Sequence, residues 1–176
     1  DVQLVTELNG EEIHLKYIPS AYLFSDLDRH AYLKDMTAGH TDYTFELDDD
    51  GRPYWVITRY DNAVGLTEQK AIGTEIIDAQ TGETVKYSVE DAPKWIDRIQ
   101  PQSFVINQIN DWGWYTNGFI NTLFAKKGII QTTHGTNYMY IDGDWYFYTG
   151  MTSAGSDEST VGFMLSNTRT KETTFY

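Results

Sequence analysis

Strict alternation of apolar and polar residues at 43–47 opens a stretch of strand and turn signals that runs to residue 89. Tyr43, Phe45 and Leu47 fall on one face of a strand, and residues typical of turns follow at 48–53. The stretch therefore predicts a meander of four antiparallel strands. These strands cover residues 43–47, 54–60, 71–78 and 83–89.

The last 16 residues of the chain repeat the second half of this meander. Residues 72–87 align without a gap with residues 161–176, and Gly, Thr, Glu, Thr and Tyr recur at five of the 16 positions. The first half of the meander is repeated as well, because Asp-Gly precedes an aromatic strand at residues 50–51 and again at residues 142–143. The repeat predicts an internal duplication and a second meander over residues 136–176. Its strands cover residues 136–141, 144–151, 161–166 and 172–176.

A helix is predicted ahead of the first meander. Leu23, Leu27 and Ala31 keep helical spacing within residues 21–36, and Ser25 or Asp26 could cap that helix. Before it, an Asn-Gly turn between apolar residues predicts a hairpin. The two strands of this hairpin are placed at residues 2–5 and 13–18.

Residues 93–127 predict the helices that precede the second meander. Pro93 suits a first helical turn, and Pro101 would end a short helix and begin a longer one. Gly113 and Gly118 lie inside the longer helix, where they allow either close approach to a sheet or a kink.

Together these elements predict an α+β fold, built from two tandem modules in which helix precedes an antiparallel β-meander. The first module covers residues 1–90, with strands at 43–89. The second covers residues 91–176, with helices at 93–127 and strands at 136–176. Since one face of each meander is apolar, each helix is expected to cover one sheet.

The order helix, Asp-Gly hairpin, then strand-Asp-x-x-Thr-Gly-Glu-strand resembles the PepSY-type modules of bacterial, in particular Gram-positive, envelope proteins. The residues that carry the resemblance are 51–56 and 76–83. In the second copy Lys171 stands where the first has Gly82, and we expect a different turn there. The resemblance implies a small, non-enzymatic interaction or regulatory unit of the envelope.

The amino-acid composition limits which classes of partner are expected and bears on where the protein is located. The net charge of −13 repels nucleic acid and anionic lipid, so neither is expected as a partner. The chain has no Cys, and no apolar run approaches the roughly 18 residues that span a bilayer. We interpret it as an extracytoplasmic piece of a larger, membrane-anchored protein, with any anchor outside this sequence.

The sequence predicts no catalytic, cofactor-binding or metal-binding residue. Signatures of common hydrolases and nucleotide-binding proteins are missing. Glu46, Asp48 and Asp50 copy the start of a calcium loop, but the closing acid would fall at Ile57, so a metal-free hairpin turn is favoured. The four His have no ligand spacing, and we interpret them as structural or surface residues.

The aromatic residues of the long helix are the candidate partner contact. They are Trp112, Trp114, Tyr115 and Phe119. Helical spacing places Trp114 about 200° from Trp112, so both cannot face one core. Either two sheets bury both sides of the helix, with Trp112 mostly buried, or the helix presents a protein-contact patch. An exposed edge at residues 172–176 could also pair with another strand.

We therefore expect a non-catalytic interaction, regulatory or scaffolding module with a protein partner. The alternative is an accessory domain or hydrolase that binds carbohydrate or peptide, because many Trp and Tyr could line such a cleft. A deep cleft with convergent carboxylates would favour the alternative.

Overall fold

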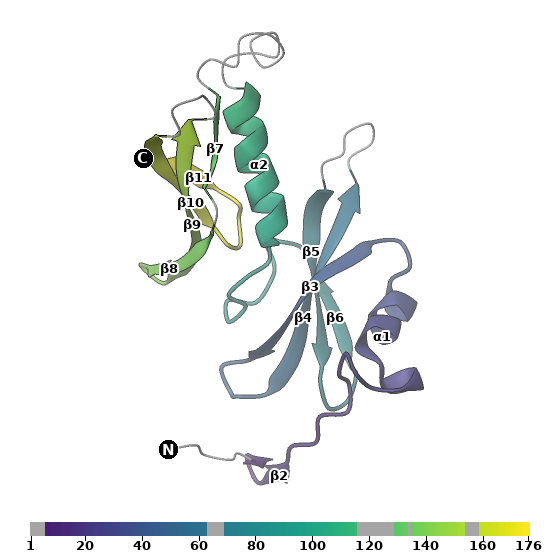
Figure 1. Cartoon of the computed structure of the whole chain (residues 1–176). Helices are drawn as coiled ribbons and strands as arrows, with labels where there is room; N and C mark the ends of the chain where they lie inside the picture. Colours follow the sequence, from purple (N-terminus) through teal and green to yellow (C-terminus); the bar gives the residue numbers. More distant parts are fainter. Residues whose placement is uncertain (1–5, 63–68, 116–128, 134, 154–158) are drawn as a thin grey trace. The chain divides into compact units, whose positions relative to one another are not determined.

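The computed structural model describes residues 6–62, 69–115, 129–133, 135–153 and 159–176 (Figure 1). The helices and the antiparallel sheets occupy separate segments, which confirms the predicted α+β class. The chain forms two compact units. Unit 1 comprises Asp1–Asn62 and Lys70–Ile99, and unit 2 comprises Ala63–Gln69 and Gln100–Tyr176.

Unit 1 begins with a short hairpin at the predicted turn. Its strands are β1 (Glu7–Leu8) and β2 (Glu11–Glu12). The predicted strand at residues 13–18 is wrong, because Lys16 and Tyr17 donate backbone N–H bonds of 2.9 and 3.0 Å to the Ala79 carbonyl outside any strand ladder. The other predicted strand, residues 2–5, lies outside the described residues.

The predicted first helix is present as α1 (Leu27–Lys34), preceded by a 3-10 turn, η1 (Leu23–Ser25). Asp26 is the cap, since its carboxylate accepts a bond of 2.8 Å from the backbone N–H of Arg29. Leu27 and Ala31, four residues apart, are fully buried and turn one face of α1 to the sheet.

The sheet of unit 1 is the predicted four-stranded meander, in the order β3-β4-β5-β6. These strands are β3 (Gly39–Leu47), β4 (Pro53–Asn62), β5 (Gln69–Asp78) and β6 (Thr84–Tyr87). Buried apolar residues cover both faces. On the α1 face they are Leu27, Ala31, Ile57 and Ile77, and on the opposite face Val56, Ile76, Ala92, Ile96 and Ile99.

The short helix predicted to begin at Pro93 is wrong, because residues 91–99 form an irregular stretch with isolated turns. Two of its polar groups bond to β3 rather than to a helical ladder. The backbone N–H of Asp97 donates to the Glu46 carboxylate at 3.2 Å, and the Arg98 guanidinium donates to Asp42 at 2.6 Å. The Asp97 N–H is thus used in a tertiary bond instead of an i to i−4 helical bond, and the Arg98 side chain adds a second link to β3.

Unit 2 contains α2 (Gln102–Tyr115) and one sheet in the order β11-β10-β9-β7, with β8 also paired to β9. The strands are β7 (Ile130–Thr132), β8 (Asn137–Ile141), β9 (Asp144–Ser153), β10 (Thr160–Asn167) and β11 (Thr173–Phe175). The four predicted strands are therefore present, and β7 was not predicted. Its three residues are too few to show alternation.

α2 lies against this sheet through residues four apart. Val105 and Ile109 pack on a cluster of buried side chains from β9 and β10. A Cβ atom at Gly113 would collide with the backbone carbonyl of Ile130. This glycine therefore allows the close approach of α2 to the sheet, the first of the two roles predicted for it. The predicted continuation of the helix, residues 116–127, lies outside the described residues, as does Gly118.

The turns after β5 and β10 have the same bonds, which corrects the expectation of a different turn at Lys171. In each turn the side-chain oxygen of Asp78 or Asn167 accepts bonds from the backbone N–H groups two and three residues on, at 2.8 to 3.0 Å. Gly82 has a φ of 76° and Lys171 a φ of 67°. The lysine therefore adopts the left-handed conformation that glycine adopts freely.

Candidate functional site

The structure places two of the predicted contact residues on the surface of unit 2. Trp112 is 44% exposed and Trp114 is 37% exposed, both near the end of α2. The prediction that Trp112 is mostly buried is wrong. Tyr115 is the last residue of α2, and its side chain, like Phe119, lies outside the described part of the chain.

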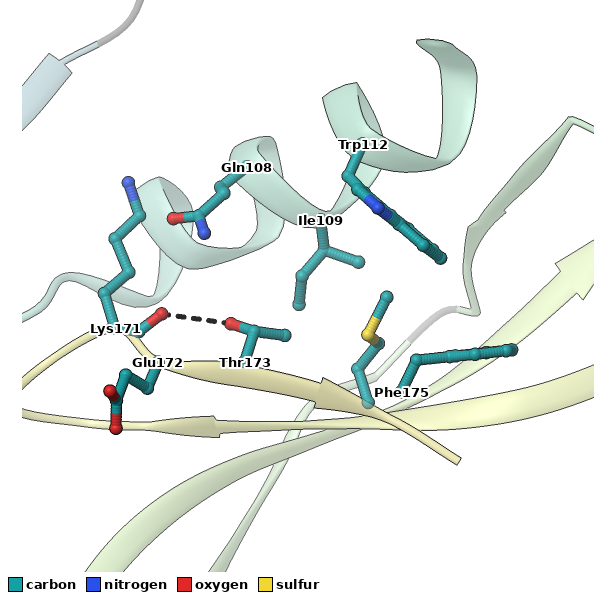
Figure 2. Close-up of a pocket in the computed structure, with 8 residues that line it drawn as sticks. Gln108, Ile109, Trp112, Lys171, Glu172, Thr173 and Phe175 are labelled. Carbon is teal, nitrogen blue, oxygen red and sulfur yellow. Dashed lines mark hydrogen bonds between the residues drawn. The ribbon is translucent and has the colours of Figure 1, made fainter. Parts of the chain in front are cut away.

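Trp112 stands at one wall of a groove between α2 and β11, which we name the α2–β11 groove (Figure 2). Its volume is about 410 Å³. The opposite wall carries Phe175, which is 41% exposed and whose ring centroid lies 5.7 Å from that of Trp112. The lining residues are Gln108, Ile109, Trp112, Met164, Lys171, Glu172, Thr173 and Phe175.

The geometry of the two elements explains why this groove is open. Val105 and Ile109 pack α2 against the sheet. Trp112 is three residues after Ile109, so it lies beside this helix–sheet contact and extends toward β11. On β11, Thr173 and Phe175 alternate with Thr174 and therefore share the face that α2 covers. Figure 2 shows the Trp112 ring extending from the helix toward the strands of the sheet that carries Phe175.

The backbone of β11 is also available on one side. Tyr176 and Phe163 exchange bonds of 2.9 and 3.0 Å, so the bonds from β11 to β10 come from every second residue. The N–H and C=O groups of Thr173 and Phe175 consequently point away from β10. Among the described residues no strand pairs with β11 on that side.

Comparison with protein-family models, curated proteins and solved structures finds no match. The resemblance to PepSY-type modules is therefore neither supported nor contradicted. Among the described residues, no helix combines the length and the apolar character that crossing a membrane requires.

A second group of residues, in unit 1, was not predicted from the sequence. Asp35, the residue that ends α1, is buried and accepts bonds from Arg59 of 2.7 and 2.9 Å. Lys86 lies 3.2 Å from the same carboxylate. Bonds from Thr37, helped by Arg59 and Lys86, hold the pKa of Asp35 well below its usual range. Asp35 thus stays ionised.

Beside this ionic group lies a buried pair on the α1 face of the sheet, His40 of β3 and Glu75 of β5. The side chain of Glu75 is 0% exposed and that of His40 is 7% exposed. His40 Nε2 lies 3.0 Å from Glu75 Oε2, although the angles fall outside hydrogen-bond geometry. Burial raises the pKa of Glu75 to about 7 and lowers the pKa of His40 below its usual 6.5.

The sequence carried one signal for this pair. Glu75 interrupts an otherwise apolar run in β5, where alternation requires a core residue. The interpretation of His40 as structural agrees with its burial, and His134 lies outside the described residues. The pair lies on the sheet under α1 and does not line the α2–β11 groove.

Other polar residues singled out in the sequence serve the fold of unit 1. The Asp48 carboxylate accepts backbone bonds from Asp50 and Arg52 at 3.0 and 2.8 Å, which fixes the β3–β4 turn. His30 Nε2 lies 2.8 Å from the Gly82 carbonyl oxygen and ties α1 to the turn after β5. Within the described residues, no three His, Asp or Glu side chains converge in a way that would hold a metal ion.

Proposed function

We propose that this chain is a non-catalytic interaction module of a larger envelope protein, and that unit 2 binds a protein partner through the α2–β11 groove. The observation that carries the proposal is the pair of half-exposed rings, Trp112 and Phe175, which line the groove with their centroids 5.7 Å apart. Large aromatic residues that border an apolar pocket are the usual anchors of protein interfaces.

The chemistry of the groove supports binding rather than catalysis. Its described lining has one carboxylate, Glu172, and one amine, Lys171. The Thr173 hydroxyl donates to the Lys171 carbonyl at 3.1 Å and lies 2.6 Å from the Ser166 hydroxyl, so it is engaged within the fold (Figure 2). A nucleophile with an adjacent base, or a pair of facing carboxylates, is the arrangement that a hydrolase would need.

The proposal includes a tandem duplication of PepSY-like modules. A Cβ atom at Gly73 of β5 would meet the carbonyl oxygen of Tyr87, and one at Gly162 of β10 would meet that of Tyr176. Both pairs are 14 residues apart, and the shared turn bonds follow the same offset of 89 residues. These correspondences support the duplication, whereas β7 has no counterpart among the described strands of unit 1.

We further propose an extracytoplasmic location, attached to the membrane through segments outside this sequence. The support is the resemblance to envelope modules together with a composition that lacks Cys. Protease digestion of intact cells tests the location, because an extracytoplasmic module is cut without lysis and a cytoplasmic one is protected.

Carbohydrate binding is the second candidate, and one groove of unit 1 favours it. There Tyr54 and Trp95 are stacked, with ring centroids 5.4 Å apart, in a groove of about 250 Å³ that also contains Asp78 and Glu83. Aromatic faces beside carboxylates are suited to sugar rings and hydroxyl groups. This candidate predicts that Trp95→Ala abolishes binding to a glycan array while Trp112→Ala leaves it intact.

A matched pair of tryptophan variants tests the main proposal. Trp112 lines the groove and Trp114 does not, although both are exposed on α2. We expect a partner captured from envelope extract to be lost with Trp112→Ala, by at least about tenfold, and retained with Trp114→Ala. Circular dichroism of both variants controls for folding. Equal capture by the wild type and both variants would contradict the proposal, as would the absence of any partner.

A further inference from the structure

The α2–β11 groove and the exposed side of β11 lie next to each other in unit 2, and together they define the kind of segment that can bind. We propose that an extended, positively charged segment of the partner adds to β11 as a new strand and inserts alternate side chains into the groove. This inference rests on the proposed function, since it names the chemistry of the partner at the same site.

The backbone of β11 supplies the main-chain part of the recognition. The outward N–H and C=O groups of Thr173 and Phe175 match the spacing of a strand laid alongside. A strand that adds there exchanges backbone hydrogen bonds with both residues. These bonds contribute affinity that does not depend on the side chains of the partner. Solvent-exposed strand edges of this kind are the usual templates for pairing with another chain.

The groove supplies the side-chain part. Lys171 to Phe175 spans four residue steps, about 13 Å at 3.3 Å per residue. An added strand turns every second side chain toward α2, so two side chains about 7 Å apart enter the groove. One lies opposite Thr173, near Gln108, where a small or polar side chain fits. The next lies opposite Phe175, beside Trp112, where the walls select an aromatic or large aliphatic side chain.

Charge complementarity decides between segments of similar shape. The chain has a net charge of −13, so an anionic segment is repelled and a cationic one is attracted during encounter. Lys171 and Glu172 at the end of the groove offset each other. The positive charges of the segment are therefore expected on residues that flank the groove, where they raise the association rate and make it fall with salt.

A proline substitution separates strand addition from simple insertion into the groove. Thr173→Pro removes the outward N–H of β11 and leaves the backbone bonds to β10 in place, because the Thr173 N–H points away from β10. It also removes the threonine hydroxyl, which bonds to Lys171 and Ser166. Thr173→Ala is the matched control, since it removes the hydroxyl and keeps the N–H.

The probe is a random peptide display library, selected against the full 176-residue chain. We expect the enriched peptides to alternate groove-facing and solvent-facing side chains, as a strand does. They should carry Lys or Arg at their ends and one large apolar residue among the groove-facing positions. Their affinity should fall about tenfold more with Thr173→Pro than with Thr173→Ala, and should fall at high salt.

The other outcomes overturn the inference in distinct ways. Peptides that lose binding with Trp112→Ala but bind Thr173→Pro normally would refute strand addition and leave the proposed function standing. Enrichment of acidic peptides would refute the charge assignment. A free chain that dimerises, and becomes monomeric with Thr173→Pro, would identify a second copy as the occupant. If no peptide is enriched, and if partner capture is unaffected by Trp112→Ala, both proposals are refuted.

Discussion

At the scale of single residues, burial shifts the pKa values of His40 and Glu75 toward a state in which the pair holds one proton, on Glu75. Glu75 prefers the protonated form because its pKa is raised from 4.5 to about 7, and His40 prefers the neutral form because its pKa lies below 6.5. Between pH 4.5 and 6.5 the unfolded pair also holds one proton, on the histidine. Folding therefore moves the proton within the pair without net uptake.

The signs of the two contributions are opposite. The raised pKa of Glu75 gives stability that is fully present below pH 4.5 and lost as pH rises through about 7. The lowered pKa of His40 gives stability that is present above pH 6.5 and lost as pH falls. Asp35, Arg59 and Lys86 border the pair, and their charges act on the pKa of both Glu75 and His40.

We predict that the single variants reveal the slopes that cancel in the wild type. Relative to the wild type, the unfolding free energy of Glu75→Gln should fall as pH is lowered from about 7, and that of His40→Gln should rise as pH is lowered from 6.5. The limit for one proton is about 1.4 kcal/mol per pH unit. Urea unfolding at several pH values measures both. Parallel pH profiles for the two variants would contradict the one-proton pair.

At the scale of elements, the turn after β10 has a lysine, Lys171, at a left-handed position where the turn after β5 has Gly82. The side-chain caps from Asp78 and Asn167 impose the same bonds in both turns, so they outweigh the preference of Lys171 for a negative φ. The left-handed conformation costs an ordinary residue about 1 kcal/mol. At Gly82 the ring of Tyr17 occupies the space of a Cβ atom.

We predict that the two turns respond oppositely to exchange of these residues. Lys171→Gly should raise the unfolding free energy of unit 2 by about 0.5–1 kcal/mol, because it relieves the backbone strain. Gly82→Ala should lower that of unit 1 by more than about 1 kcal/mol, since it adds both strain and a clash with Tyr17. Thermal unfolding measures both, and Lys171→Ala, which keeps the strain, is the control. Destabilisation by Lys171→Gly would show that the lysine side chain stabilises this turn.

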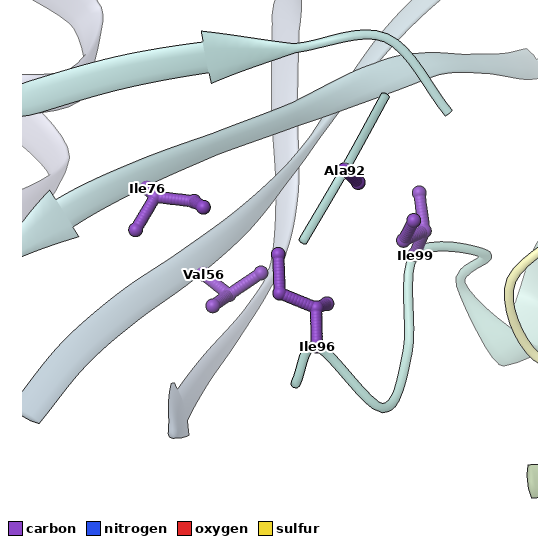
Figure 3. Packing of buried hydrophobic residues seen from close by; sticks show 5 residues of the cluster. All are labelled: Val56, Ile76, Ala92, Ile96 and Ile99. Carbon is purple, nitrogen blue, oxygen red and sulfur yellow. The ribbon is translucent and has the colours of Figure 1, made fainter. Parts of the chain in front are cut away.

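The strands and turns could be predicted from the sequence because their signals are local. Alternation, Asp-Gly dipeptides and the Asp26 cap all act within a few residues. The segment 91–99 could not be predicted, because its apolar residues keep near-helical spacing and yet fill one sheet face without a helix. Figure 3 shows Ile96 of that segment pointing toward Val56, and Ile99 belongs to the same buried cluster.

The candidate site was predictable only in part, for a similar reason. Spacing along the helix identified Trp112 and Trp114 as unable to share one core, and both are exposed. Which of them borders a groove depends on where β11 lies, and that is set by sheet pairing across unit 2. Phe175 carried no local signal, since an aromatic residue near the end of a strand is typical of a core position as much as of a binding wall.

At the scale of the whole molecule, charge and binding chemistry are divided between the two parts of the chain. Residues 1–99 carry 20 Asp and Glu against nine Lys and Arg, whereas residues 100–176 carry six against four. The near-neutral part contains the α2–β11 groove, where apolar contacts dominate. The acidic part contains the ionic residues around Asp35. We infer that long-range attraction of a cationic partner comes mainly from residues 1–99, and specific contact from unit 2.

The same division predicts two unfolding transitions, because each buried apolar cluster draws its residues from one unit only. Leu27 and Met151 are both 0% exposed, in unit 1 and unit 2, and neither lines the groove. Leu27→Ala should lower the stability of one transition by about 2–5 kcal/mol, and Met151→Ala the other by a similar amount. Differential scanning calorimetry of the full chain resolves them. If both variants shift a single common transition, the two units unfold as one, and mutations in the unit 1 core would then weaken partner binding at unit 2 as well.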